Sequence, residues 1–251
     1  MSGDASRQGG SPAAQDELGR ELARWAAAGE VQVPDLDALR SSLDAALAEE
    51  RGLGAFLRSR TTPLRLVVAG VLLLAAMGAV WLLAARVDQE LYPMWRLLLG
   101  LGFMLVAFFA SVGLALWPLS RPAPRPRLVS TVLALAPVLL AGLYLMPAAH
   151  ADHPASLQQP GTAALLVRAS PCFGVGVLIA LLSVWGLRRL DRGGTRVALL
   201  LATASGVAAN ILLLLHCPMT APAHMLLGHL GVMLVFVAGT WLAQRGPPAA
   251  A

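Results

Sequence analysis

The sequence predicts an all-α, polytopic membrane protein with six transmembrane helices preceded by a short helical cytoplasmic segment. Three observations predict this class. The 251 residues are 57% hydrophobic and only 13% charged, whereas soluble domains carry about 25% charged residues. The apolar residues gather in six stretches, most of them close to the ~20 residues that cross a bilayer. Arginines stand in small groups between these stretches, as membrane flanks do.

The first fifty residues differ in charge from the rest of the chain. They contain ten acidic residues and four arginines, a net charge of six units negative. Residues 1–14 are polar and rich in Gly and Ser, so we expect a disordered tip. Residues 15–62 carry leucines at helix spacing, which predicts an acidic helical cytoplasmic segment.

The segment is predicted to form short amphipathic helices with a narrow apolar stripe, and such helices cannot bury their stripes alone. The stripe therefore predicts a binding surface. Its acidic charge favours a basic protein partner over an anionic membrane surface. The alternative is a helical hairpin that packs only on itself. The predicted partner-binding residues are Leu18, Leu22, Trp25, Leu36, Leu39, Leu43 and Leu47.

Residues 63–245 are predicted to hold the six spans, and residues 246–251 form a C-terminal tail. The fourth span is short unless it extends back towards Ala163. Glycines within the spans predict close helix packing at positions 100, 102, 174 and 176. The predicted spans are Leu66–Ala85, Leu97–Trp117, Leu128–Met146, Cys172–Leu187, Val197–Leu215 and Met225–Ala243.

The arginines predict the orientation. Beyond the first fifty residues, twelve of them lie before the first span, after the second, after the fourth or after the sixth, and three lie in the opposite loops. Because cytoplasmic loops carry the excess of basic residues, both termini are expected in the cytoplasm.

All five histidines and both cysteines then fall on the extracytoplasmic side. Cys172 opens the fourth predicted span, and His216 and Cys217 close the fifth. His229 lies about one turn inside the sixth. The remaining histidines lie in loops, where a solvated role is the simpler interpretation for the first two: they are His150, His153 and His224.

Two chemistries are compatible with this arrangement. Cys172 and Cys217 can form a disulfide in an oxidising compartment. Alternatively, thiolates and imidazoles can bind zinc or copper. The predicted sensing residues are Cys172, Cys217, His216 and His229, and the predicted metal ligands among them are Cys172, Cys217 and His216. No other cofactor is expected.

Other chemistry is scarce. The chain contains no GxxxxGK[ST], HExxH or GxSxG motif, so we expect no enzyme, no small-molecule substrate and no direct contact with nucleic acid. Asn210 is the one strongly polar residue deep in the fifth span and predicts a hydrogen bond between helices.

Three features together resemble a known family. The fifth span ends in Ala-Asn-Ile-Leu-Leu-Leu-Leu-His216-Cys217-Pro218, the fourth opens with Pro171-Cys172, and an acidic soluble stretch precedes six spans. The chain resembles the NrsF-like family of bacterial membrane anti-sigma factors and, more loosely, the CarR-type regulators of myxobacteria. The layout of residues 15–245 carries the resemblance, together with the His-Cys-Pro element.

The resemblance implies a protein of the bacterial inner membrane that captures an extracytoplasmic-function sigma factor with its N-terminal segment. Such a protein is a negative regulator of transcription in a stress response. It also implies that Cys172 and Cys217 take part in sensing. Residues 223–229 depart from the more polar, Trp-bearing approach to the last span in the family, so the stimulus does not carry over.

Two other classes of function remain open. A transporter or metal permease would use the His and Cys residues as a selectivity site. A membrane enzyme would ligate haem between His216 and His229.

Overall fold

The computed structural model describes residues 20, 41–42, 52–88, 90, 92–118, 122–146, 162–191 and 195–245. Contacts divide the chain into two units, Met1–Arg51 and Gly52–Ala251, and every helix named below belongs to the second. The predicted tip, the partner-binding stripe, the tail at 246–251 and the loop histidines His150 and His153 lie outside the described residues.

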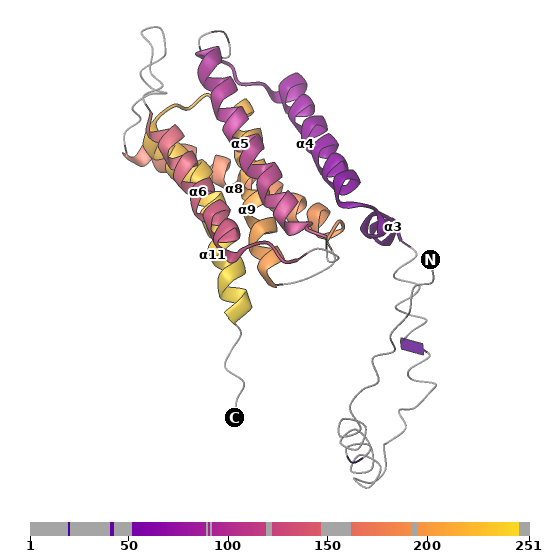
Figure 1. Cartoon of the computed structure of the whole chain (residues 1–251). Helices are drawn as coiled ribbons and strands as arrows, with labels where there is room; N and C mark the ends of the chain where they lie inside the picture. Colours follow the sequence, from indigo (N-terminus) through magenta and orange to yellow (C-terminus); the bar gives the residue numbers. More distant parts are fainter. Residues whose placement is uncertain are drawn as a thin grey trace, which may run out of the picture. The chain divides into compact units, whose positions relative to one another are not determined.

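Every secondary-structure element described in the second unit is a helix, which confirms the all-α prediction (Figure 1). A short helix, α3 (Leu53–Ser59), precedes six spans that are long and apolar enough to cross a membrane. This makes the chain a multi-pass membrane protein. The first five spans are α4 (Thr62–Ala84), α5 (Met94–Ala115), α6 (Pro126–Leu145), α8 (Thr162–Arg188) and α9 (Thr195–His216).

The sixth span, Pro222–Arg245, is built from three pieces. It begins with the short α10 (Pro222–His224), continues as a π-helix, η1 (Met225–Leu230), and ends as α11 (Gly231–Arg245). A π-helix is a wider turn than an α-helix and is frequent at functional sites. The sixth span is therefore irregular where it begins and regular where it ends.

The fourth span takes the longer of its two predicted forms. Helix α8 begins at Thr162, ten residues before Cys172, so the span extends back past Ala163 and does not open at Cys172. At 1.5 Å per residue, Cys172 lies about 15 Å along the helix. The apolar run is interrupted by Arg168, Ser170 and Pro171, but a membrane helix tolerates such residues where neighbouring groups satisfy them.

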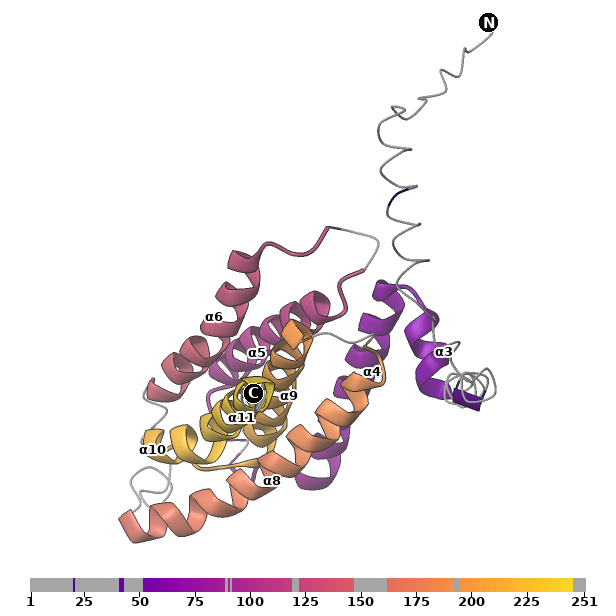
Figure 2. The same ribbon diagram turned by 90° about the horizontal axis from the view of Figure 1, so that it is seen from below.

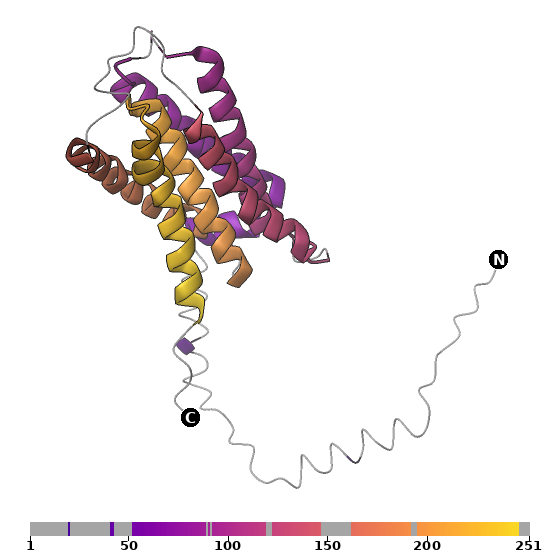
Figure 3. The same cartoon turned by 90° about the vertical axis from the view of Figure 1, so that its left-hand side faces the viewer.

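Helix α9 forms the core of the bundle (Figure 2). It contacts α4, α5, α6, α8 and α11, and 83% of its most apolar window is buried, against 17% for α4 and α8. Its middle consists of small residues, 202–209, which let other helices approach closely. A Cβ atom on Gly206 would lie only 2.7 Å from the Cα of Met233 on α11. The two helices run side by side in Figure 3.

The glycine predictions hold at two of four positions. A Cβ on Gly100 would meet Leu143 at 3.1 Å, and one on Gly176 would meet Val232 at 2.7 Å. Gly102 and Gly174 have no neighbouring atom within 4 Å of such a Cβ, so they do not serve close packing.

At one end of the bundle, Arg65 at the start of α4 links this helix to two others. Its buried guanidinium donates hydrogen bonds to the carbonyls of Leu190, just beyond α8, and Leu116, just beyond α5. These carbonyls have no partner within their own helices, because the last turn of a helix leaves them free. The start of α4 and the ends of α5 and α8 therefore meet here, at what we call the Arg65 end.

The opposite end is joined by two other buried arginines. Arg96, at the start of α5, donates to the carbonyl of Leu143 on α6. The backbone N–H of Arg86, just after α4, donates to the carbonyl of Leu215 on α9. We call this the Arg86 end. The helices thus run alternately up and down between the two ends.

Candidate functional site

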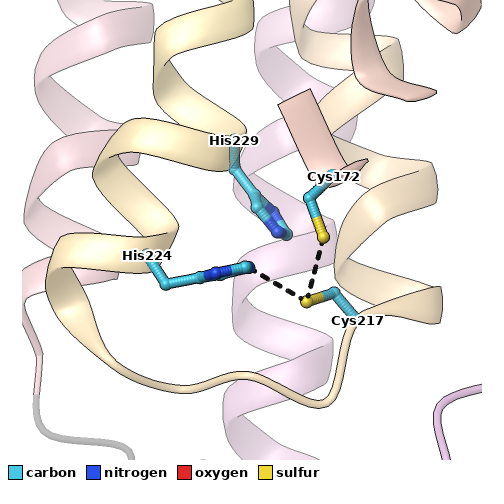
Figure 4. Close-up of side chains that lie close together, drawn as sticks. All are labelled: Cys172, Cys217, His224 and His229. Carbon is cyan, nitrogen blue, oxygen red and sulfur yellow. Dashed lines mark hydrogen bonds between the residues drawn. The ribbon is translucent and has the colours of Figure 1, made fainter. Parts of the chain in front are cut away.

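Four side chains meet in one cluster near the Arg86 end: Cys172, Cys217, His224 and His229 (Figure 4). Taking one sulfur or ring-nitrogen atom from each residue, the four atoms lie within 4.8 Å of one another. The two Sγ atoms are 3.6 Å apart, and Nε2 of His224 lies 3.3 Å from Sγ of Cys217. Among the described residues, this is the group of His, Cys, Asp and Glu side chains close enough to hold a metal ion.

Cys217 is positioned by the end of α9. Its backbone N–H still donates to the carbonyl of Leu213 at 2.8 Å, so the residue continues the helical path. Pro218 follows, and proline cannot supply the N–H that the next helical hydrogen bond needs. The chain therefore turns at this point, and Pro222 starts α10 in the first helical turn, where a proline is tolerated.

The π-helix brings the two histidines to one face. His224 and His229 are five residues apart, which in an α-helix would separate them by about 140° around the axis. The wider π turn of η1 reduces that angle. Their ring centroids lie 5.5 Å apart, and both rings point towards the two sulfur atoms (Figure 4).

Cys172 reaches the cluster because α8 and η1 approach each other closely. A Cβ on Gly228 would lie 3.3 Å from the carbonyl oxygen of Ala169 and 3.4 Å from Cβ of Cys172, so the glycine lies directly against α8. Pro171 removes the hydrogen bond that would join it to the carbonyl of Val167. That carbonyl instead accepts a hydrogen bond from Oγ of Ser170 at 3.3 Å.

The cluster is buried in apolar surroundings. His224 and His229 are fully buried, Cys217 is 3% exposed, and Cys172 is partly exposed. Neither ring nitrogen of His229 has a hydrogen-bond partner in the described part of the chain, and neither does Nδ1 of His224. A buried polar group without a partner costs about 1–3 kcal/mol. The fold therefore keeps these imidazoles at a cost to its stability, which is typical of a functional site.

A hydrogen-bonded pair supports His229 from behind. Asn210 on α9 donates from Nδ2 to the backbone carbonyl of His229 at 3.2 Å and to that of Gly206 at 2.7 Å. The hydroxyl of Tyr144 on α6 donates to Oδ1 of Asn210, and its ring packs edge-on against the imidazole of His229. The prediction that Asn210 makes a hydrogen bond between helices is confirmed.

The predicted sensing residues are brought together with one exception. Cys172, Cys217 and His229 share the cluster, but His216 does not. Its exposed ring places Nδ1 2.8 Å from the carbonyl of Ala84. Successive residues on a helix point about 100° apart, so His216 and Cys217 face different directions. Of the predicted metal ligands, the structure therefore brings Cys172 and Cys217 together and leaves His216 outside the cluster that contains His229.

His224 takes the place of His216. From the sequence, His224 is expected in a loop, across a short turn from Cys217, because no apolar run begins before Met225. The available signals were Pro222, which suits the first turn of a helix, and the spacing of five residues from His229. That spacing suggests a shared face only if the turn between the two residues is a π-helix.

The arrangement supports two kinds of chemistry. Both cysteines are free thiols, and two neighbouring thiols can be oxidised together to a disulfide. Two thiolates and two imidazoles are also a complete ligand set for a tetrahedral metal ion. The cluster consists of thiols and imidazoles and contains no acidic side chain. Its chemistry is therefore that of a redox sensor or a metal site.

In comparisons with known proteins, the chain matches no family model, no curated protein and no solved structure. The resemblance to the NrsF-like family therefore stays a prediction from the sequence.

Proposed function

We propose that this chain is an anti-sigma factor of the bacterial inner membrane. In this proposal residues 15–62 hold an extracytoplasmic-function sigma factor, and a signal at the cluster of Cys172, Cys217, His224 and His229 releases it. The observation that carries the proposal is the position of the cluster. It lies near the Arg86 end of the bundle, whereas α4, which follows the N-terminal segment along the chain, begins at the Arg65 end.

The arginine distribution supports the orientation that the proposal needs. Two of the three arginines on the proposed outer side are used inside the fold. Arg86 pairs with Asp88 at 2.6 Å, and Arg96 donates to the carbonyl of Leu143. The arginine-rich loops therefore stand out more clearly as the cytoplasmic side.

The charge of the N-terminal segment supports the choice of partner. A sigma factor reads DNA, and nucleic-acid-binding surfaces are basic. The first fifty residues carry six net negative charges, and residues 15–62 carry nine acidic residues against six arginines together with the leucine stripe. Such a segment complements a basic surface electrostatically and offers apolar contacts. Occupying that surface would keep the sigma factor from DNA and polymerase.

The helix contacts supply a route between the two ends. The cluster joins α8, the end of α9 and the start of the sixth span, and α9 contacts most other helices of the bundle. A change in the bonds among the four side chains therefore acts on the packing of helices that continue to the Arg65 end. Switching almost completely from bound to released needs the signal to favour one state by roughly 5 kcal/mol.

The test is capture of the sigma factor by the full chain. We expect affinity-tagged protein from native membranes to retain a sigma factor, identified by mass spectrometry. Leu39→Asp with Leu43→Asp should abolish retention, because both side chains lie on the apolar stripe. Ser41→Asp with Ser42→Asp adds the same charge off the stripe and should retain it. Membranes that yield no sigma factor, or equal retention in both variants, would contradict the proposal.

A metal permease is the second candidate, favoured by the depth of Cys172 along α8. A permease moves its ion across the bilayer, whereas a sensor only binds it. Uptake of zinc into proteoliposomes that contain the purified chain would support the permease, and binding without uptake would support the regulator.

A further inference from the structure

The geometry points to a tetrahedral site for one divalent metal ion of the zinc class, with Cys172, Cys217, His224 and His229 as its four ligands. The metal site is argued from the cluster alone. The further statement that metal is the signal for release of the sigma factor rests on the proposed function.

The distances within the cluster fit such an ion. Zinc binds sulfur at about 2.3 Å and imidazole nitrogen at about 2.0–2.1 Å, so a tetrahedron has sulfur atoms about 3.8 Å apart and sulfur–nitrogen pairs about 3.6 Å apart. The two Sγ atoms lie 3.6 Å apart, and the Sγ of Cys217 and Nε2 of His224 lie 3.3 Å apart. No pair among the four ligand atoms exceeds 4.8 Å, so side-chain movements of about 1 Å complete the geometry.

The donor atoms select the class of metal. Two sulfurs and two imidazole nitrogens suit borderline or soft ions, whereas magnesium and calcium prefer oxygen. The described cluster contains no carboxylate. Binding displaces both thiol protons, so two thiolates and two neutral imidazoles balance the charge of a dication. A neutral site is favoured among membrane helices, where an unbalanced charge is costly.

The unpartnered imidazoles are an independent indication. His229 is fully buried and has no hydrogen-bond partner for either ring nitrogen among the described residues, yet its ring points at the two sulfurs (Figure 4). A metal ion supplies the missing partner to one of these nitrogens. The carbonyl of the same residue is held by Asn210, which fixes the backbone that carries the ligand.

The first experiment measures metal on the purified, full-length protein in detergent. We expect about one zinc per chain after reconstitution and dialysis. Cobalt(II) serves as a spectroscopic substitute and should give the intense visible bands of a tetrahedral ion with sulfur-to-metal charge transfer. Calcium and magnesium should neither bind nor displace cobalt. A zinc ratio far below one, or the weak spectrum of octahedral cobalt, would overturn the proposal.

Variants then assign the ligands. Cys172→Ser, Cys217→Ser, His224→Asn and His229→Asn should each weaken zinc binding by at least about tenfold. His216→Asn is the matched control, because it changes a histidine at the same end that lies outside the cluster. It should keep the full metal content. Equal loss in His216→Asn would remove the four-ligand assignment.

A second measurement needs no variant and so does not depend on folding of altered chains. Zinc should protect both thiols of the wild-type chain from alkylation, and a chelator should restore labelling. If the chain instead carries a disulfide, its mass is two hydrogens lower, it takes up no zinc, and the metal site is overturned while the redox sensor stands. All these readouts are independent of sigma-factor capture, so failure here and failure of the proposed function are told apart.

Discussion

The hydroxyl of Tyr144 donates a hydrogen bond of 2.6 Å to Oδ1 of Asn210 and so ties α6 to α9 directly behind the cluster. Through Asn210 the same link reaches the backbone of His229. The cluster is therefore supported by a hydrogen-bond network that connects α6, α9 and η1.

The first prediction concerns this network. Tyr144→Phe leaves Oδ1 of Asn210 without its partner and should lower the free energy of unfolding by about 1 kcal/mol. Unfolding in mixed detergent micelles measures the change. A double-mutant cycle with Asn210→Ala should show coupling between the two sites. Leu82→Ala, at a residue that is 82% exposed, should stay within about 0.5 kcal/mol of wild type. Equal losses of stability in Tyr144→Phe and Leu82→Ala would argue against the hydrogen bond between Tyr144 and Asn210.

The second prediction concerns the buried ion pair of Arg86 and Asp88, whose side chains are 2% and 3% exposed. Asp88→Asn removes one charge and leaves the guanidinium buried without its counter-charge. The expected loss is about 3–5 kcal/mol in the free energy of unfolding. Glu90→Gln removes an exposed charge from the same loop and should change little. A small effect of Asp88→Asn would mean that the pair is not buried in the membrane-embedded protein.

The third prediction tests the packing of α9 on α11. Gly206→Ala places a methyl group 2.7 Å from the Cα of Met233, so the helices must separate. We expect a loss of about 1–3 kcal/mol. Gly113→Ala on α5 meets no atom within 4 Å and should be neutral or stabilising by up to about 1 kcal/mol, because alanine favours helix. Thermal unfolding of the three proteins side by side gives the comparison, and the reverse order would refute the packing.

The fourth prediction fixes the orientation. In a background of Cys172→Ala and Cys217→Ala, single cysteines are introduced as Ser59→Cys at the Arg65 end and Glu90→Cys at the Arg86 end. Both positions are exposed. An impermeant maleimide added to intact cells with a permeabilised outer membrane should label Glu90→Cys only. Labelling of Ser59→Cys without disruption of the inner membrane would reverse the orientation and place the cluster on the cytoplasmic side.

Local composition was sufficient for the spans. Crossing lipid requires about 20 apolar residues in succession, which is a property of the segment and not of its neighbours. Five predicted spans begin and end within four residues of the observed ones. For the fourth, hydropathy left open whether the span begins at Cys172 or extends back towards Ala163, because it cannot show that Ser170 satisfies the carbonyl that Pro171 leaves free.

The sequence by itself was sufficient to predict a helical chain with six membrane spans and with all its thiols and histidines on one side. Only the tertiary structure decided which of them meet. The sequence favoured His216, which adjoins Cys217, over His224, but a helix directs adjacent side chains about 100° apart, and that turns His216 away from Cys217. A π turn and the close approach of η1 to α8 at Gly228 bring His224 and His229 to the two sulfurs. Both effects arise from packing between segments up to 57 positions apart, Cys172 and His229, and packing of that kind is not encoded in any local pattern.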